Sequence, residues 1–151
     1  MTLGTTVWQH EVNGYVFGPE TSWGITKGFA AWWSLPVRDQ DYALDLENGS
    51  VPGTDTQGPR SFVFDVETTG ITTAADAAAA MADLADAFAP GASVELHAIL
   101  PDADAGPSGH VKVIGRCRGA EFDADSDLTL GKVTGQVFFV AHSPTISEVT
   151  P

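Results

Sequence analysis

The alternation of apolar and polar residues in RSFVFDVET, residues 60–68, constrains the fold most. A period of two is that of a β-strand with one buried face. One face would carry Phe62, Phe64 and Val66, and the other Val63, Asp65 and Glu67. Further β-rich segments are predicted at 7–17, 28–35, 93–100, 110–118 and 132–142. The chain is therefore expected to be mainly β.

One segment has the spacing of a helix instead. In TTAADAAAAMADLADAF, an apolar stripe is formed by Ala77, Ala80, Met81, Leu84 and Phe88. Thr72 or Thr73 can cap the first turn, and Pro90-Gly91 ends the helix. We predict an α+β chain, a β-sandwich or split barrel with one amphipathic helix over about residues 73–89.

Two connections are informative. Asn13-Gly14 lies between β-rich runs and predicts a hairpin with a type I′ turn, which needs positive φ angles. The polar stretch from 37 to 59 is too long for a simple connection, and long loops in compact domains usually have a function.

Length and charge limit the partners. A chain of 151 residues suits one domain, residues 1–151, with one core. Twenty acidic residues against seven basic ones give a net charge of −13, which repels phosphate backbones. No apolar run approaches the ~20 residues of a membrane-spanning helix. We expect a soluble chain that binds neither nucleic acid nor membrane.

The stretch FDVETTG resembles the first metal-binding motif of DEDD exonucleases, whose acidic residues would be Asp65 and Glu67. The stretch HAILPDA at 97–103 resembles the last metal-binding motif of the same family. A two-metal nuclease needs several converging carboxylates. Asp65 and His97 are separated mainly by the predicted helix, whose Asp residues lie off its apolar stripe. No middle Asp motif fits, and the alternation of a half-buried strand explains Asp65 and Glu67 as well. We expect no enzyme activity, and an exonuclease remains a remote alternative.

Metal and cofactor sites are not predicted either. Asp123, Asp125 and Asp127 have the opening spacing of a calcium loop, but Leu128 and Thr134 replace the required Gly and Glu. The four histidines are expected to be separate surface or half-buried residues: His10, His97, His110 and His142.

Cys117 shares a strand face with Val111, Val113 and Gly115. A core position is therefore predicted for its thiol, and no nucleophilic role.

The adjacent Trp32 and Trp33 suggest a partner surface. Neighbours on a strand point to opposite faces, so at least one of the two is expected to lack a core to enter. Burial beneath the long polar loop is the other interpretation.

The order of several segments resembles the N-terminal domain of siphovirus distal tail proteins, especially minor tail proteins of phages that infect actinobacteria. The likeness covers nearly the whole chain. It is carried by NGYVFGP at 13–19, LPVRDQDY at 35–42 followed by NGSVPGTD, RSFVFDVETTG led by Arg60, ADLADAFAP at 82–90, and VIGRCRG running to VFFVAHSPTIS. The sequence departs from the family's pattern at three points. Asn48-Gly49 replaces the common Asp-Gly, and the final turn lacks its Asp. The sequence also stops where many relatives continue into a second domain.

This resemblance implies a structural protein of the virion tail tip, made in the host cytoplasm. Its subunits would form a hexameric ring that joins the tail tube protein to other tail-tip proteins and surrounds a channel for passing DNA. An acidic channel wall would keep DNA from sticking. We assign the subunit interface to the aromatic pair, the long loop and the strand after it: Trp32, Trp33, Arg38, Asp39, Asn48, Gly49 and Arg60. A carbohydrate-binding β-sandwich, with Trp32 or Trp33 stacked on sugar, is the alternative.

Overall fold

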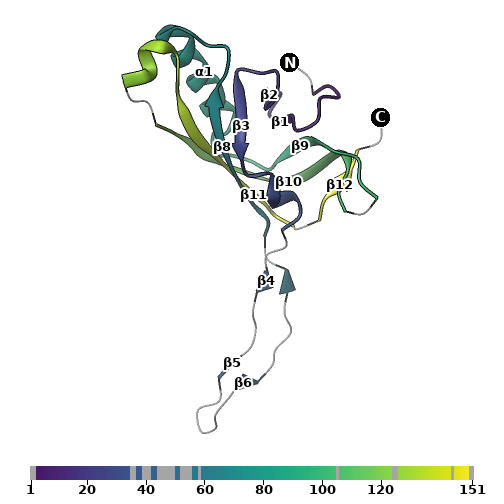
Figure 1. The fold of residues 1–151 in the computed structure, drawn as a ribbon. Coiled ribbons are helices and arrows are strands. Elements are labelled where there is room, and N and C mark those ends of the chain that lie inside the picture. Colours follow the sequence, from purple (N-terminus) through teal and green to yellow (C-terminus); the bar gives the residue numbers. More distant parts are fainter. Residues whose placement is uncertain are drawn as a thin grey trace.

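An antiparallel sheet that nearly closes on itself forms most of the computed structural model, which describes residues 3–34, 37–38, 42–43, 50–51, 56–57, 59–104, 106–123, 126–143 and 145–149 (Figure 1). Its elements are β1 (His10–Val12), β2 (Tyr15–Phe17), β3 (Trp23–Lys27), η1 (Phe29–Trp32), β4 (Val37–Arg38), β5 (Tyr42–Ala43), β6 (Ser50–Val51), β7 (Thr56–Gln57), β8 (Ser61–Thr68), α1 (Ala74–Ala87), β9 (Val94–Leu100), β10 (Gly109–Asp123), η2 (Ser126–Leu130), β11 (Thr134–Ala141) and β12 (Ser147–Glu148).

The sheet has the strand order β2-β1-β9-β10-β11-β8-β3, and β12 pairs with β10. Its two edge strands are consecutive in the chain, and the N–H of Gly18 donates to the carbonyl of Trp23 at 2.7 Å. The two edges therefore meet, and the wall is close to a closed barrel. The predicted mainly β fold, with a split barrel and one helix, is confirmed.

The β1–β2 hairpin forms where the sequence predicted it. Asn13 and Gly14 have φ angles of 51° and 79°, as a type I′ turn requires. The Asn13 side chain also donates from Nδ2 to the carbonyl of Ala87 at 2.8 Å, so the turn is bound to the end of α1.

The predicted faces of β8 are also confirmed. Phe62, Phe64 and Val66 are buried, and Val63 and Glu67 are exposed. The Phe62 ring contacts the Phe139 ring of β11, and the Phe64 ring contacts Phe17 of β2. Aromatic side chains from several strands therefore fill the barrel.

Helix α1 lies over the upper end of the barrel in Figure 1. Thr73 caps it by accepting the N–H of Asp76 at 3.2 Å. The stripe packs into the barrel core through Ala77, Ala80, Leu84 and Phe88, whereas Met81 is only half buried. The helix is fixed to the sheet by the Trp23 Nε1–H, which donates to the carbonyl of Ala80 at 3.1 Å.

The strand predicted at 28–35 is wrong, because residues 29–32 form the 3₁₀ helix η1. Gly28 has a φ of 119°, and a Cβ there would lie 2.3 Å from the carbonyl oxygen of Val63. The chain passes too close to β8 to continue as a strand. The tight helical turn directs Phe29 and Trp32 to the same side, where both rings contact His10.

Strand β10 extends beyond the predicted 110–118, from Gly109 to Asp123. The register of β10 against β11 shifts between Cys117 and Ala120, at a bulge where Gly119 has a φ of 100°. The N–H of Gly119 donates to the carbonyl of Phe88 at 2.9 Å. The bulge thus turns a backbone donor toward the end of α1.

Within the polar stretch of 37–59, two short ladders are described. Strand β4 pairs with β7, and β5 pairs with β6. The β5–β6 pair lies between β4 and β7 in the sequence, which is the pairing order of a single hairpin. Figure 1 shows these strands below the barrel. No helix in the described residues is long and apolar enough to cross a bilayer.

Candidate functional site

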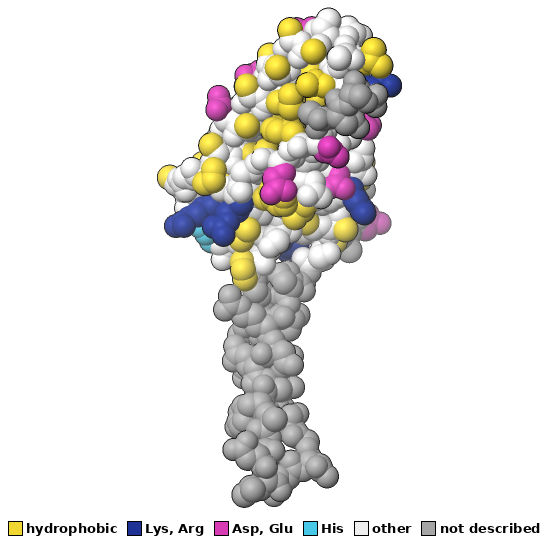
Figure 2. Space-filling model, turned by 90° about the vertical axis from the view of Figure 1, so that its left-hand side faces the viewer, with side chains coloured by type: hydrophobic (Ala, Val, Ile, Leu, Met, Phe, Trp, Pro, Cys, Tyr) yellow, Lys and Arg dark blue, Asp and Glu magenta, His cyan; other side chains and the backbone are white. Residues whose placement is uncertain are grey.

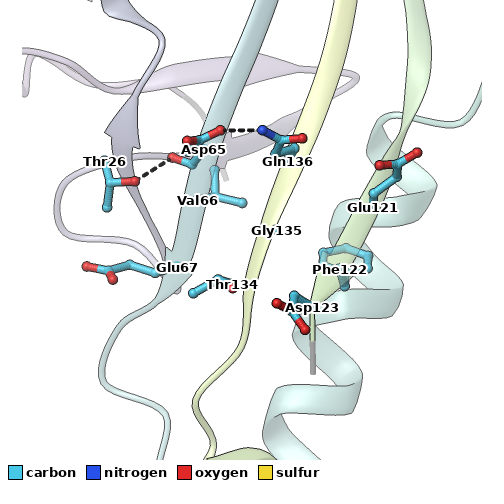
Figure 3. Close-up of a pocket in the computed structure, with 10 residues that line it drawn as sticks. All are labelled: Thr26, Asp65, Val66, Glu67, Glu121, Phe122, Asp123, Thr134, Gly135 and Gln136. Atoms are coloured by element: carbon cyan, nitrogen blue, oxygen red, sulfur yellow. Dashed lines mark hydrogen bonds between the residues drawn. The ribbon is translucent and has the colours of Figure 1, made fainter. Parts of the chain in front are cut away.

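An open acidic hollow of about 410 Å³ lies on the outside of the barrel wall (Figure 3). Asp65 and Glu67 of β8 form one side, and Glu121 and Asp123 of β10 form the other. Strand β11 runs between them, and its Gln136 donates from Nε2 to Oδ1 of Asp65 at 2.8 Å. The carboxylates are therefore held on two strands that are not neighbours.

This geometry differs from a two-metal centre. The four carboxylates are spread along their strands and do not converge (Figure 3), and the described residues contain no group of three or more His, Cys, Asp or Glu side chains suited to a metal. His97 lies on β9, separated from β8 by β10 and β11 in the sheet. The fold therefore keeps the two nuclease-like motifs apart.

The residues with calcium-loop spacing do not share one loop. Asp123 is the last residue of β10, Leu128 lies in η2 and Thr134 begins β11. Asp125 and the side chain of Asp127 lie outside the described residues.

His10 corrects the expectation that each histidine is at or near the surface, because its side chain is completely buried. The Nε1–H of Trp32 donates to Nε2 of His10 at 2.9 Å, so the proton of the neutral ring is on Nδ1, which donates to the carbonyl of Trp8 at 2.9 Å. Burial lowers the pKa of His10 to about 4. His10 is therefore a neutral structural group that joins β1 to η1.

His97 and His110 form a pair that the sequence analysis missed. Nδ1 of His97 lies 2.9 Å from Nε2 of His110, and Nε2 of His97 lies 2.9 Å from a carboxylate oxygen of Glu95. Lys112 contacts the same carboxylate at 3.3 Å. Burial, and next the charge of His97, lower the pKa of His110. Only the register of β9 against β10 could have indicated this contact.

Cys117 is a core residue, as predicted. Its side chain is buried, and burial raises the pKa of the thiol to about 11. A thiol with so high a pKa is a poor nucleophile near neutral pH.

The two adjacent tryptophans have different environments. Trp32 is buried, whereas Trp33 is 44% exposed. An exposed Trp was one of the two interpretations left open by the sequence, and the cause of the exposure is the 3₁₀ turn and not strand alternation. Trp33 borders a second open hollow, of about 450 Å³, whose lining is aromatic, apolar and charged: Trp32, Trp33, Arg60, Gly106, Pro107, Ile146 and Glu148.

Arg60 is one of the few buried charged residues in the described part of the chain, with 3% exposure. Its Nη1 donates to the carbonyls of Ala31 and Ser34, at 2.6 and 2.7 Å. The guanidinium therefore holds the end of η1 against the start of β8, and so places Trp33. No pattern in the sequence indicated this contact.

The other residues assigned to the interface are mostly not described. The backbone of Arg38 forms part of β4, while Asp39, Asn48 and Gly49 lie outside the described residues.

The fold has counterparts among phage proteins. No protein-family model and no curated protein matches the sequence. The SPP1 Dit protein, described as a paradigm of the hub adsorption apparatus of phages that infect Gram-positive bacteria, is similar in structure, with a TM-score of 0.64 and 16% identity over 92% of this chain and 51% of that one. The chain has the fold of a phage hub protein.

Two structures of the phage p2 baseplate in its activated conformation contain a similar chain. The calcium form gives a TM-score of 0.59 and the strontium form 0.60, each with 13% identity over 89% of this chain and 44% of that one. The chain spans about half the length of the hub and baseplate chains that it resembles.

Proposed function

We propose that this chain is a structural protein of a phage tail tip, a distal tail protein whose subunits form a hexameric ring. The observation that carries the proposal is the hub fold, which extends over 92% of the chain. The ring would join the tail tube protein to other tail-tip proteins and leave a channel for DNA. The protein would be located in the virion and, during assembly, in the host cytoplasm.

The charge and the surface support this role. A net charge of −13 makes a wall that repels a passing phosphate backbone. Trp33 offers a large exposed aromatic side chain beside an open hollow, and buried tryptophans often dominate the energy of a contact between proteins. We therefore place Trp33, positioned by Arg60, at the contact with the adjacent subunit. The contact would be heterologous, as a closed ring requires.

Negative-stain images of the purified protein test the ring. The expected result is closed rings with six-fold symmetry in the wild-type protein, and their loss in Trp33→Ala. Leu130→Ala is the matched control, because Leu130 is 58% exposed but lies on η2, away from this hollow. Rings that still form in Trp33→Ala would show that Trp33 is not part of the contact. Isolated particles of single-subunit size in the wild-type protein would contradict the ring.

Carbohydrate binding is the second candidate. An exposed indole beside polar groups can stack on a sugar ring, and Trp33 shares its hollow with Glu148. Binding of the monomer to a glycan array, lost in Trp33→Ala, would favour this function over the connector.

A further inference from the structure

His97 and His110 bring two imidazole nitrogens together on the outside of the sheet. They lie on the adjacent strands β9 and β10, where His97 is paired with Lys112 and His110 with Ile99. Nδ1 of His97 lies 2.9 Å from Nε2 of His110, and the planes of the two rings are inclined by 56°. The backbone ladder therefore holds two nitrogen ligands of one chain within reach of a single metal ion.

The carboxylate of Glu95 determines which nitrogen of His97 is free. Nε2 of His97 lies 2.9 Å from this carboxylate and donates its proton to it. A neutral ring then has its lone pair on Nδ1, which is the atom that faces His110. Histidines that bind metals usually donate their other ring N–H to a carboxylate or carbonyl, which fixes the tautomer and makes the ligand more basic. The ring of His97 is therefore oriented as a metal ligand.

His110 can supply the second nitrogen by a change of tautomer. Its Nε2 carries the proton of the hydrogen bond to Nδ1 of His97. When that proton is replaced by one on Nδ1 of the same ring, the lone pair of Nε2 becomes free. Burial is the main cause that lowers the pKa of His110, and it favours the neutral ring that a metal ion requires.

A zinc ion needs only a small opening of the pair. With Zn–N bonds of ~2.0–2.1 Å and a tetrahedral angle, the two nitrogens lie ~3.3 Å apart. This is about 0.4 Å more than the 2.9 Å of the hydrogen-bonded pair. Both side chains are only partly buried, so the rings can turn until their lone pairs converge.

The charges around the pair favour a cation. Glu95 contacts His97, and Glu11 is paired with His97 in the register of β1 against β9. Lys112 contacts the second oxygen of Glu95 at 3.3 Å, so two carboxylates outweigh one ammonium group. Figure 2 shows acidic side chains spread over the face that it views. The net charge of −13 attracts cations to the surface of the whole chain.

We propose that His97 and His110 form a binding site for a late first-row divalent metal ion such as Zn²⁺, with Glu95 as a positioning residue. Imidazole nitrogens suit such ions, whereas Mg²⁺ and Ca²⁺ prefer oxygen ligands. The described part of the chain has no group of three or more side chains suited to a metal, so water completes the coordination. Binding is therefore weaker than in a structural zinc site of four side chains.

The ion joins β9 to β10 and stabilises the barrel wall, because it binds the folded chain in preference to the unfolded one. Both ligands come from one chain, so the site does not depend on the proposed ring.

Titration with Zn²⁺ of protein without a histidine tag tests the site. Isothermal titration calorimetry at about 0.1 mM protein detects dissociation constants from about 1 µM to 1 mM. We expect one Zn²⁺ per chain. Binding should be at least ~10-fold weaker in His97→Ala and in His110→Ala, because each variant keeps a single imidazole of the pair. Zn²⁺ should also raise the melting temperature of the wild type and not that of these variants.

Glu95→Gln tests the positioning role. This variant keeps both ligands but removes the carboxylate charge, and should weaken binding by about 10-fold. The ¹⁵N chemical shifts of the His97 ring report its tautomer, and the fraction with the proton on Nε2 should fall in the variant. Unchanged affinity and an unchanged tautomer would overturn the role of Glu95.

His142→Ala is the matched control. His142 is exposed and contacts Ser93 at 2.8 Å, so its loss leaves both ligands in place and should leave Zn²⁺ binding unchanged. In NMR spectra, Zn²⁺ should shift the ring signals of His97 and His110 and leave those of His142 in place. Thermal melting without metal confirms that each variant is folded, and His97→Gln and His110→Gln replace the alanine variants if those unfold.

Three outcomes would overturn the proposal. They are a wild-type chain that binds no Zn²⁺ up to about 1 mM, a loss of binding in His142→Ala as large as in the pair variants, and binding of Mg²⁺ or Ca²⁺ as strong as that of Zn²⁺. The last outcome would indicate carboxylate ligands in place of imidazoles. A chain that binds Zn²⁺ at the pair but forms no ring would contradict the proposed function and leave this site intact.

Discussion

The inner and outer sides of the same barrel wall place their side chains in different environments. Along β8, the inward Phe62 and Phe64 are completely buried, while the outward Val63 is 41% exposed. The inward residues fill one aromatic core, and the outward ones place charged, polar and apolar groups at the surface. Because β alternation separates the two sets residue by residue, stability and interaction can be changed independently at neighbouring positions.

Trp32 and Trp33 show the same division without a strand. Trp32 is buried and donates to His10, whereas Trp33 is exposed beside a hollow. The difference between core and surface therefore does not depend on the type of secondary structure, and it can be tested at each pair of neighbours.

The largest expected effect comes from the inner side. Phe64→Ala removes a completely buried ring that contacts Phe17 and His10, and should lower the free energy of unfolding by roughly 3–5 kcal/mol. Val63→Ala, one residue away on the outer side, should cost less than about 1 kcal/mol. Urea unfolding of both variants measures the difference. Equal losses of unfolding free energy would contradict the assignment of Phe64 to the core and Val63 to the surface.

The next effect is the pH dependence that His10 causes. Its pKa is about 4 in the folded chain, against an ordinary value of 6.5. The unfolded chain therefore binds a proton that the folded chain does not, and stability is lost as the pH falls from 6.5 toward 4. The loss should reach about 3 kcal/mol between pH 7 and pH 4.

Urea unfolding across this pH range measures that loss, with His10→Asn as the comparison. The variant keeps the pH response of the surface carboxylates but lacks the His10 contribution. Identical pH slopes for the two proteins would mean that His10 is not neutral and buried in the folded state.

Trp33→Ala should affect assembly and not the fold. Because the side chain is 44% exposed, its loss should change the free energy of unfolding by less than about 1 kcal/mol. As the anchor of the proposed subunit contact, it should weaken assembly by about 2 kcal/mol or more. Melting curves and light scattering of the same samples separate the two effects, and a large loss of stability without a change in assembly would assign Trp33 to the core.

The smallest effect is expected in the acidic hollow. Asp65→Asn with Glu67→Gln removes two outward charges and leaves the core unchanged, so stability should change by about 0.5 kcal/mol or less. We expect no magnesium- or manganese-dependent degradation of single-stranded DNA by the parent chain. Degradation that disappears in this variant would show that the outer side has a catalytic role.

Features determined by nearby residues could be predicted from the sequence. The buried face of β8, the Thr73 cap and stripe of α1, and the turn at Asn13-Gly14 each depend on a few adjacent positions. Local periodicity and positive φ angles are sufficient to predict them.

Features determined by contacts between distant segments could not be predicted. Gly28 ends a strand-like pattern because β8 passes close to it, and His10 is buried because Trp32 and Trp8 come to it from other segments. The contact of His97 with His110 depends on strand register, and the buried position of Arg60 depends on the carbonyls of η1. The candidate site was therefore only partly predictable: an exposed Trp was one of two interpretations of the Trp pair, and the hydrogen bonds of Arg60 that position it were not foreseen.

The most direct test of the central claim, that this barrel assembles into a ring, is the mass of the wild-type protein by light scattering. We predict that the mass rises with protein concentration toward six times the 15.8 kDa of one chain, and does so more readily at higher salt, which screens the repulsion between acidic copies. A mass of 15.8 kDa at every protein and salt concentration would contradict the claim for the isolated chain.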